Sequence, residues 1–233
     1  MNGRPRSPRR RDVRSGVSPA GNVLAIDAAG PEPGVVVLAR GEVFEERLPS
    51  DRQASERLLG AVARALERGG IALADCDRIA VCSGPGSFTG LRVGLSTAWG
   101  LGRALSIPVE EVSTLEALAE TFRGARLADI TAALDAGRGE AVVQSFSLEG
   151  PRARPLGDPQ RITLEAAAGL PAPLAALPAG LLGSRAGVPP SSLARSLALA
   201  VAVSPRGATG AAARAPQAIY SRPSAAEEKR GAP

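Results

Sequence analysis

The chain has 233 residues, of which 44% are apolar, 3% are aromatic and none is histidine, and it carries a formal net charge of +5. This length allows one large domain or two small lobes around an aliphatic core, and the missing histidine excludes imidazole bases, the usual catalytic triads and most zinc sites. The charge does not indicate a nucleic-acid-binding body, because residues 1–21 hold six arginines against one aspartate and the rest of the chain is balanced.

The N-terminal residues 1–21 consist mainly of Arg, Pro, Ser and Gly, and we expect a disordered basic tail there. The apolar segment behind this tail is short and is interrupted by Asp27, which argues against an export signal, and no stretch has the length of a membrane span. Cys76 and Cys82 fit buried, reduced thiols without a disulfide. We therefore expect a cytoplasmic protein with no membrane contact.

The first half of the chain alternates predicted strands and helices. Apolar residues at helical spacing predict the helices, and short apolar runs between turn residues predict the strands. Gly69-Gly70 ends the first helix, and Ser113 or Thr114 is the N-cap of the third. In chain order we expect a strand at 23–26 that ends at Asp27, a hairpin of 35–38 and 43–48, a helix at 51–68, a strand at 78–82, a helix ending near 106, a strand at 108–113 and a helix at 114–122.

The second half is less regular, and between residues 150 and 213 it is rich in Pro, Ala and Gly, so that element boundaries are poorly defined. We expect a hairpin of 128–134 and 140–147, and a helix at 193–203. A strand, an aspartate, a turn and a hairpin follow one another near Asp27 and again near Asp135, which indicates a duplicated α/β architecture of two lobes. The predicted division is an N-terminal lobe at 22–113, a smaller second lobe at 114–223 and a disordered tail at 224–233.

A glycine-rich loop at residues 83–90, with the sequence SGPGSFTG, lies between a predicted strand and a predicted helix. Backbone N–H groups and the positive end of a helix dipole would suit an anion there, but a tight turn from strand to helix needs the same glycines. The loop is not a Walker A motif, because no Gly-Lys-Ser/Thr follows, and its glycines are spaced one residue too far apart for a dinucleotide fingerprint. Gly84, Gly86, Ser87 and Thr89 are candidate ligand-binding residues, with helix capping by Ser87 or Thr89 as the structural alternative.

The helix after this loop carries small residues four apart, at Gly90, Gly94, Ala98 and Gly102. Glycine inside a helix costs up to about 1 kcal/mol relative to alanine, so the stripe indicates close approach of another element. The sheet of the same chain and a helix of another protein are both candidates for that element.

Several blocks of the sequence resemble one family. Residues 84–96, GPGSFTGLRVGLS, are similar to the signature of the TsaB (YeaZ) family nearly letter for letter. Residues 108–119, 134–140 and 215–223 resemble later blocks of that family in the same order. The resemblance covers residues 22 to about 223, strongly to residue 147 and thinly from 150 to 213.

The resemblance implies an actin/Hsp70/sugar-kinase-like (ASKHA) fold of two lobes, with mixed sheets flanked by helices. It also implies a non-catalytic scaffold that forms a heterodimer with TsaD and activates it; TsaD is the paralogue that carries the metal and transfers threonylcarbamoyl to the tRNA adenosine next to the anticodon. TsaE belongs to the larger complex, tRNA contacts come only through the complex, and the chain alone could form a homodimer. No catalytic residue, metal or cofactor of its own is implied.

In this family, two helices equivalent to 51–68 and 90–105 meet a helix pair of TsaD. The resemblance therefore predicts these partner-interface residues: Leu58, Leu59, Val62, Gly94, Ala98 and Gly102.

The sequence departs from the family pattern at two places. Ala54 stands where the family often has histidine, and the first strand ends Asp27-Ala28-Ala29 instead of Asp-Thr-Ser. Both differences remove polar groups that a kinase-like fold would use for metal or phosphate.

Alternative functions remain open at this point. The chain could be a kinase-like phosphotransferase or ATP-binding protein that uses Asp27, Asp135 and the glycine loop, although residues 150–213 show no second phosphate loop. It could bind RNA directly, although the balanced body and the few aromatic residues argue against it. It could be a metal-dependent glycoprotease, although the sequence shows no set of zinc ligands.

Overall fold

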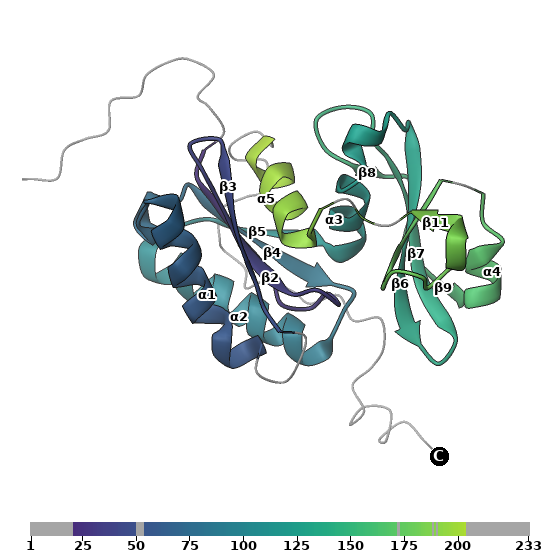
Figure 1. Cartoon of the computed structure of the whole chain (residues 1–233), viewed down its shortest axis with the longest axis horizontal. Helices are drawn as coiled ribbons and strands as arrows, with labels where there is room; N and C mark the ends of the chain where they lie inside the picture. Colours follow the sequence, from purple (N-terminus) through teal and green to yellow (C-terminus); the bar gives the residue numbers. More distant parts are fainter. Residues whose placement is uncertain (1–20, 50–53, 172, 188, 190, 204–233) are drawn as a thin grey trace, which may run out of the picture.

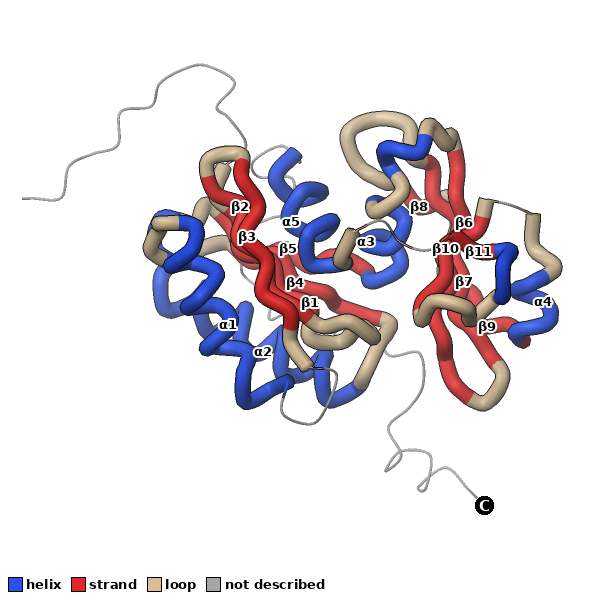
Figure 2. The backbone as a smooth tube through the Cα atoms, in the orientation of Figure 1, coloured by secondary structure: helices blue, strands red, loops and turns tan. Residues whose placement is uncertain are grey.

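The computed structural model describes residues 21–49, 54–171, 173–187, 189 and 191–203 (Figures 1 and 2). The two predicted tails lie outside the described residues, except for Gly21, and so does the block at 215–223. None of the described helices has the length and apolar character needed to cross a membrane.

The first lobe is built on a five-stranded mixed sheet in the order β3-β2-β1-β4-β5. Its strands are β1 (Val23–Asp27), β2 (Gly34–Ala39), β3 (Glu42–Arg47), β4 (Arg78–Gly84) and β5 (Val109–Ser113). The first three strands form an antiparallel meander, and β4 and β5 continue the sheet in parallel with β1. The strands of this lobe lie where the sequence predicted them.

The two faces of the first sheet are covered by different helices. Alternate residues of β1 point to opposite faces: Leu24 and Ile26 pack under α1 (Ala54–Gly69) and α2 (Phe88–Leu105). Val23 and Ala25 pack under α3 (Thr114–Glu120) and α5 (Leu193–Val203). Every residue of β1 is buried, and its sequence is apolar up to Asp27 at its end, as expected for a central strand.

The second sheet repeats the connectivity of the first. Its strands are β6 (Asp129–Gly137), β7 (Glu140–Ser147), β8 (Arg154–Pro155), β9 (Gln160–Thr163), β10 (Leu174–Leu177) and β11 (Ala186–Gly187). Strands β6, β7 and β9 form an antiparallel meander, and β10 and β11 then run parallel to β6, with α4 (Leu164–Ala168) between β9 and β10. The predicted two-lobe fold of mixed sheets flanked by helices is confirmed.

The layers follow one another as α1 and α2, the first sheet, α3 and α5, the second sheet, and α4 (Figure 1). Short 3-10 turns at Leu73–Asp75, Arg123–Ala125 and Gly183–Arg185 complete the described secondary structure. One hydrophobic cluster joins both lobes, with Leu118 of α3 and Leu197 of α5 packed between Val36 of the first sheet and Phe146 of the second.

The position of α5 bears on the predicted domain boundaries. The sequence assigned residues 114–223 to the second lobe, but α5 contacts β1, β2 and β4 of the first sheet. Its apolar side chains, including Ala198 and Val201, cover the sheet face that α1 and α2 leave open. We propose a first lobe of residues 22–113 together with α5.

Candidate functional site

The glycine-rich loop closes against the segment that follows β1. The backbone N–H of Ser87 donates to the carbonyl oxygen of Ala29 at 3.0 Å. A Cβ at Gly86 would lie 2.7 Å from that same oxygen, and a Cβ at Gly90 would lie 2.0 Å from the carbonyl oxygen of Ala28. Glycine is required at both positions because the two backbones approach so closely.

The candidate ligand-binding residues of this loop take different places. Gly84 is buried at the end of β4 with a φ of +108°, a conformation that favours glycine. The Ser87 hydroxyl is the N-cap of α2, because its Oγ accepts the N–H of Gly90 at 3.3 Å. Gly86 and Thr89 are exposed. The geometry accounts for the loop as a structural turn, and ligand binding there stays a prediction.

Asp27 is fully buried beside this loop. Its Oδ1 accepts the N–H groups of Ala29 at 3.0 Å and Gly30 at 2.9 Å, so that the carboxyl holds the turn after β1. A Cβ at Gly30 would lie 2.6 Å from Oδ2 of Asp27 and 3.2 Å from Leu193 of α5, which shows how tightly the carboxyl is enclosed.

Burial sets the protonation of this site. It raises the pKa of Asp27, against the hydrogen bonds from the N–H groups of Gly30 and Ala29. It also raises the pKa of the buried Cys82 thiol, and the carboxylate of Asp27 adds to that rise. Burial therefore disfavours the charged carboxylate and thiolate forms, which are the forms that bind a cation.

Asp135, the second predicted aspartate, is exposed near the end of β6 in the second sheet. Its Oδ1 accepts the N–H of Gly137 at 2.7 Å, across the irregular end of the β6–β7 hairpin. Each aspartate is thus engaged by its own turn. Within the described ranges, no group of three or more His, Cys, Asp or Glu side chains could hold a metal ion.

The small-residue stripe of α2 faces the chain's own first lobe. A Cβ at Gly102 would lie 2.5 Å from Cγ2 of Val109, and a Cβ at Gly94 would contact Ala28 at 3.4 Å. Ala98 is fully buried in the core beneath α1 and α2. The sequence left two candidates for the element that packs against the stripe, the chain's own sheet and a helix of another protein. The structure places the chain's own sheet and the loop after β1 there.

The interface prediction therefore needs correction. On α1, Leu58 and Val62 point into the core, whereas Leu59 is 59% exposed. Five of the six predicted interface residues are buried or packed within the first lobe, because the apolar face of each helix covers the sheet. Side chains enclosed in this way are not available to a partner.

The opposite faces of the same two helices are exposed and carry charged side chains, small residues and a few large apolar ones. We call this surface the outer face, and it consists of Leu59, Gly60 and Ala63 of α1 and Ser96, Trp99 and Gly100 of α2. Trp99 is 42% exposed, and a Cβ at Gly100 would meet nothing within 4 Å. A tryptophan exposed on a helix beside small residues offers another helix both an anchor and room to approach.

The outer face was not identified from the sequence. The spacing of the small residues places them on one side of α2, but it does not tell whether that side faces the sheet or solvent. The usable signal was the single tryptophan of the chain together with the pair Ser96 and Gly100, which lie on the other side of α2 from Gly94 and Ala98.

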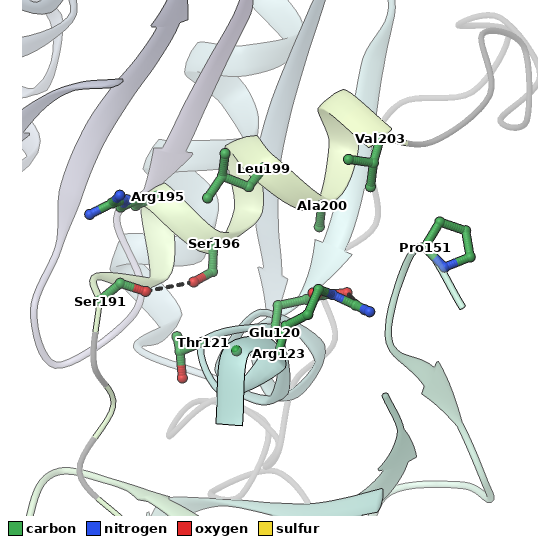
Figure 3. A pocket seen from close by; sticks show the side chains of 11 residues that line it. Glu120, Thr121, Arg123, Pro151, Ser191, Arg195, Ser196, Leu199, Ala200 and Val203 are labelled. Carbon is green, nitrogen blue, oxygen red and sulfur yellow. Dashed lines mark hydrogen bonds and ion pairs between the residues drawn. The ribbon is translucent and has the colours of Figure 1, made fainter. Parts of the chain in front are cut away.

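A cavity of about 370 Å³ lies between the end of α3 and the length of α5 (Figure 3). It is lined by Glu120, Thr121, Arg123, Gly124, Pro151, Ser191, Arg195, Ser196, Leu199, Ala200 and Val203. Two pairs of its polar groups bind one another: Arg123 lies 2.6 Å from Glu120, and the hydroxyls of Ser191 and Ser196 are 3.0 Å apart. Leu199 and Val203 make its rim apolar, and the paired polar groups do not form a catalytic set.

Comparison with known proteins adds independent information. A family model described as TsaD, tRNA N6-adenosine threonylcarbamoyltransferase, matches residues 48–201. The tRNA threonylcarbamoyladenosine biosynthesis protein TsaB of Escherichia coli is 35% identical over 119 residues, 51% of this chain and 52% of that protein. TsaB of Haemophilus influenzae is 35% identical over 115 residues, 49% of each chain. The matched region thus spans about half the length of these curated relatives.

Solved structures agree with these relatives. YeaZ from Pseudomonas aeruginosa has a TM-score of 0.58 at 30% identity and covers 66% of this chain and 70% of its own. A second Pseudomonas aeruginosa structure, described as an uncharacterized protein with similarity to the peptidase YeaZ, has a TM-score of 0.60 at 29% identity and covers 67% of this chain and 74% of its own.

Proposed function

Since this chain belongs to the TsaB (YeaZ) family, we propose that it is a non-catalytic partner subunit that binds and activates TsaD in the threonylcarbamoylation of tRNA adenosine next to the anticodon. Membership of the family connects the chain to tRNA threonylcarbamoyladenosine biosynthesis. The partner, the activation and the absence of catalysis are the proposal. TsaE would join the larger complex, which we expect in the cytoplasm.

The outer face is the observation that carries the proposal. Helices α1 and α2 lie side by side on one face of the first sheet and present Leu59 and Trp99 to solvent. A helix pair with exposed apolar side chains and small neighbours can complete a four-helix bundle with a second helix pair. In the absence of TsaD, the same face would serve a homodimer.

The enclosed Asp27 supports the non-catalytic part of the proposal. A phosphotransferase needs a carboxylate that reaches a metal ion or a substrate hydroxyl. Here the carboxyl has no exposed surface, and its Oδ1 already binds two backbone N–H groups. The glycine-rich loop beside it packs against the chain's own backbone.

The direct test is the affinity for purified TsaD, with Trp99→Ala as the variant. Truncating a central aromatic anchor costs about 2 kcal/mol, so the Kd is expected to rise about 30-fold. Modification of tRNA in a reconstituted reaction should fall in parallel at subsaturating protein. Leu156→Ala is the matched control, because Leu156 is an apolar residue of the second lobe with 49% exposure.

The proposal fails if Trp99→Ala binds TsaD as tightly as the unchanged chain. It also fails if the purified chain alone modifies tRNA. A melting curve of each variant separates lost binding from lost folding, and an unchanged curve is expected because the Trp99 side chain is partly in solvent.

A further inference from the structure

A group of ion pairs connects the second lobe to the first. Arg152 lies in the segment between β7 and β8, and its Nη1 donates to Oε1 of Glu110 on β5 at 2.5 Å. Its Nε donates to Oε1 of Glu116 on α3. One guanidinium of the second lobe therefore binds carboxylates of the first sheet and of the helix between the sheets.

The carboxylate of Glu110 is also held from the other side. Arg78 of β4 lies 3.6 Å from it, and the Arg78 guanidinium donates to the carbonyl oxygen of Val201 on α5 at 2.8 Å. Glu110 is only 5% exposed. The network thus joins β4, β5 and α5 of the first lobe to Arg152.

A second set of bonds holds the same segment of the second lobe. Arg123, just after α3, donates to the carbonyl oxygens of Leu148 at 3.1 Å and Gly150 at 2.8 Å. Glu120 of α3 accepts the backbone N–H of Ala153 and binds Arg123 at 2.6 Å. The segment around Arg152 is therefore tied to α3 on both sides of that residue.

The charged groups of this network are largely buried, so each of them needs a well-placed partner of opposite charge. Burial raises the pKa of Glu116, and the hydrogen bond from Arg152 opposes that rise; the nearby carboxylates of Glu120 and Glu110 raise the pKa further. Removal of one partner from an enclosed pair leaves a charge without compensation. Apolar contact between the lobes has no preferred direction, whereas two hydrogen bonds from one planar guanidinium fix an orientation.

We propose that Arg152 is an interlobe latch, which fixes the second lobe at one angle to the first and makes the chain a rigid platform. The latch depends on contacts within this chain alone. It therefore stands independently of the proposed role beside TsaD, and it can be tested without a partner.

The test measures the distance distribution between the lobes by energy transfer from Trp99. This is the only tryptophan of the chain and lies in the first lobe, so it is a unique donor. A Glu165→Cys substitution on the exposed side of α4 provides the acceptor position in the second lobe. The natural thiols Cys76 and Cys82 are buried and have raised pKa values, so the added cysteine reacts selectively at neutral pH.

Arg152→Met keeps an unbranched side chain and removes the charge. We expect a wider distance distribution at temperatures well below unfolding, together with a melting temperature lower by roughly 10 °C. Arg154→Met, an exposed arginine two residues further on, should leave both quantities unchanged. Leu58→Ala, in the core beneath α1, should lower the melting temperature while the distribution stays narrow.

Two results would overturn the latch. The first is a distribution as narrow in Arg152→Met as in the unchanged chain. The second is equal broadening in Leu58→Ala, which would mean that the spread reports lost stability. If Arg152→Met does not fold, Glu110→Gln decides, because it removes the charge of the first-lobe partner of Arg152 and should also broaden the distribution.

Discussion

The carboxyl group of Asp27 holds the backbone of the turn that follows β1. Its Oδ1 binds two N–H groups of the turn after β1, and the turn in turn supports the glycine-rich loop through Ala29. Only one carboxyl oxygen is needed for this role. The position therefore requires an acceptor more than it requires a charge.

We predict that Asp27→Asn preserves the fold and changes the dependence of stability on pH. The folded pKa of Asp27 lies above its usual value of 3.8, so its contribution to stability is complete below that value and is lost as the pH rises through the folded pKa. Asparagine keeps the acceptor and cannot ionise. At pH 7 the variant should melt no earlier than the unchanged chain.

Melting curves of both proteins between pH 3 and pH 8 check this prediction. The difference in melting temperature should move in favour of Asp27→Asn as the pH rises. A constant loss of stability at every pH would show that the carboxylate itself is required.

A second prediction at the residue scale concerns the thiols of Cys76 and Cys82. Burial raises the pKa of Cys76 to about 12, with a further contribution from the charges of Asp77 and Asp75, and burial also raises the pKa of Cys82. Thiolate is the reactive form, so neither cysteine should react with a thiol reagent in the folded chain at pH 8. Both should react in denaturant. Rapid modification of either thiol before unfolding would contradict the assignment.

At the scale of elements, two glycines on different sides of α2 have different roles. Gly102 faces the sheet, where an added methyl group would lie 2.5 Å from Val109 and 2.8 Å from the carbonyl oxygen of Ile107. Gly100 faces solvent, where an added methyl group would meet nothing within 4 Å. The inner glycine is required by packing, and the outer one is not.

Alanine at each position should therefore have opposite effects. Gly102→Ala is expected to lower the free energy of unfolding by about 1–3 kcal/mol through overpacking. Gly100→Ala is expected to raise it by up to about 1 kcal/mol, because alanine is the better helix former. Chemical denaturation of the two variants measures both values. Equal destabilisation would mean that α2 tolerates no change on either face.

The elements of the first lobe were predictable because each carries a strong local signal. The uniformly buried β1 is apolar up to Asp27 at its end, and α1 has apolar residues at helical spacing with glycine after them. The strands from β8 to β11 span two to four residues each, and they depend on pairing with distant strands. Local periodicity has too few residues there to indicate an element.

The candidate site shows a different limit of the sequence. The glycine-rich loop and Asp27 were identified, but their burial against each other depends on segments that only the fold brings together. The stripe on α2 was found with its spacing correct, and the direction of that stripe is set by where the first sheet lies.

For the whole molecule, the shared core means that the lobes are not independent. Leu197 of α5 is fully buried in the cluster that also contains Val36 of the first sheet and Phe146 of the second. We predict that Leu197→Ala lowers the stability of both lobes together, by about 2–5 kcal/mol. The first lobe can be followed by Trp99 fluorescence, and the second sheet by hydrogen exchange of β6 and β7.

One transition, shared by both probes and shifted equally in the variant, is the expected result. Two separate transitions would show that the lobes unfold as separate units. The control is Ala167→Gly on α4, which lies in the cluster on the far side of the second sheet and should affect hydrogen exchange there first.

The return of α5 to the first lobe also has a consequence for synthesis on the ribosome. Strands β1, β2, β4 and β5 emerge early, but the apolar face that includes Val23, Ala25 and Val36 lacks its α5 cover until residues 193–203 leave the exit tunnel. The entire second lobe is translated in that interval. The first lobe can therefore complete its packing only after the second has been made, and until then the part of this sheet face that α5 covers stays open.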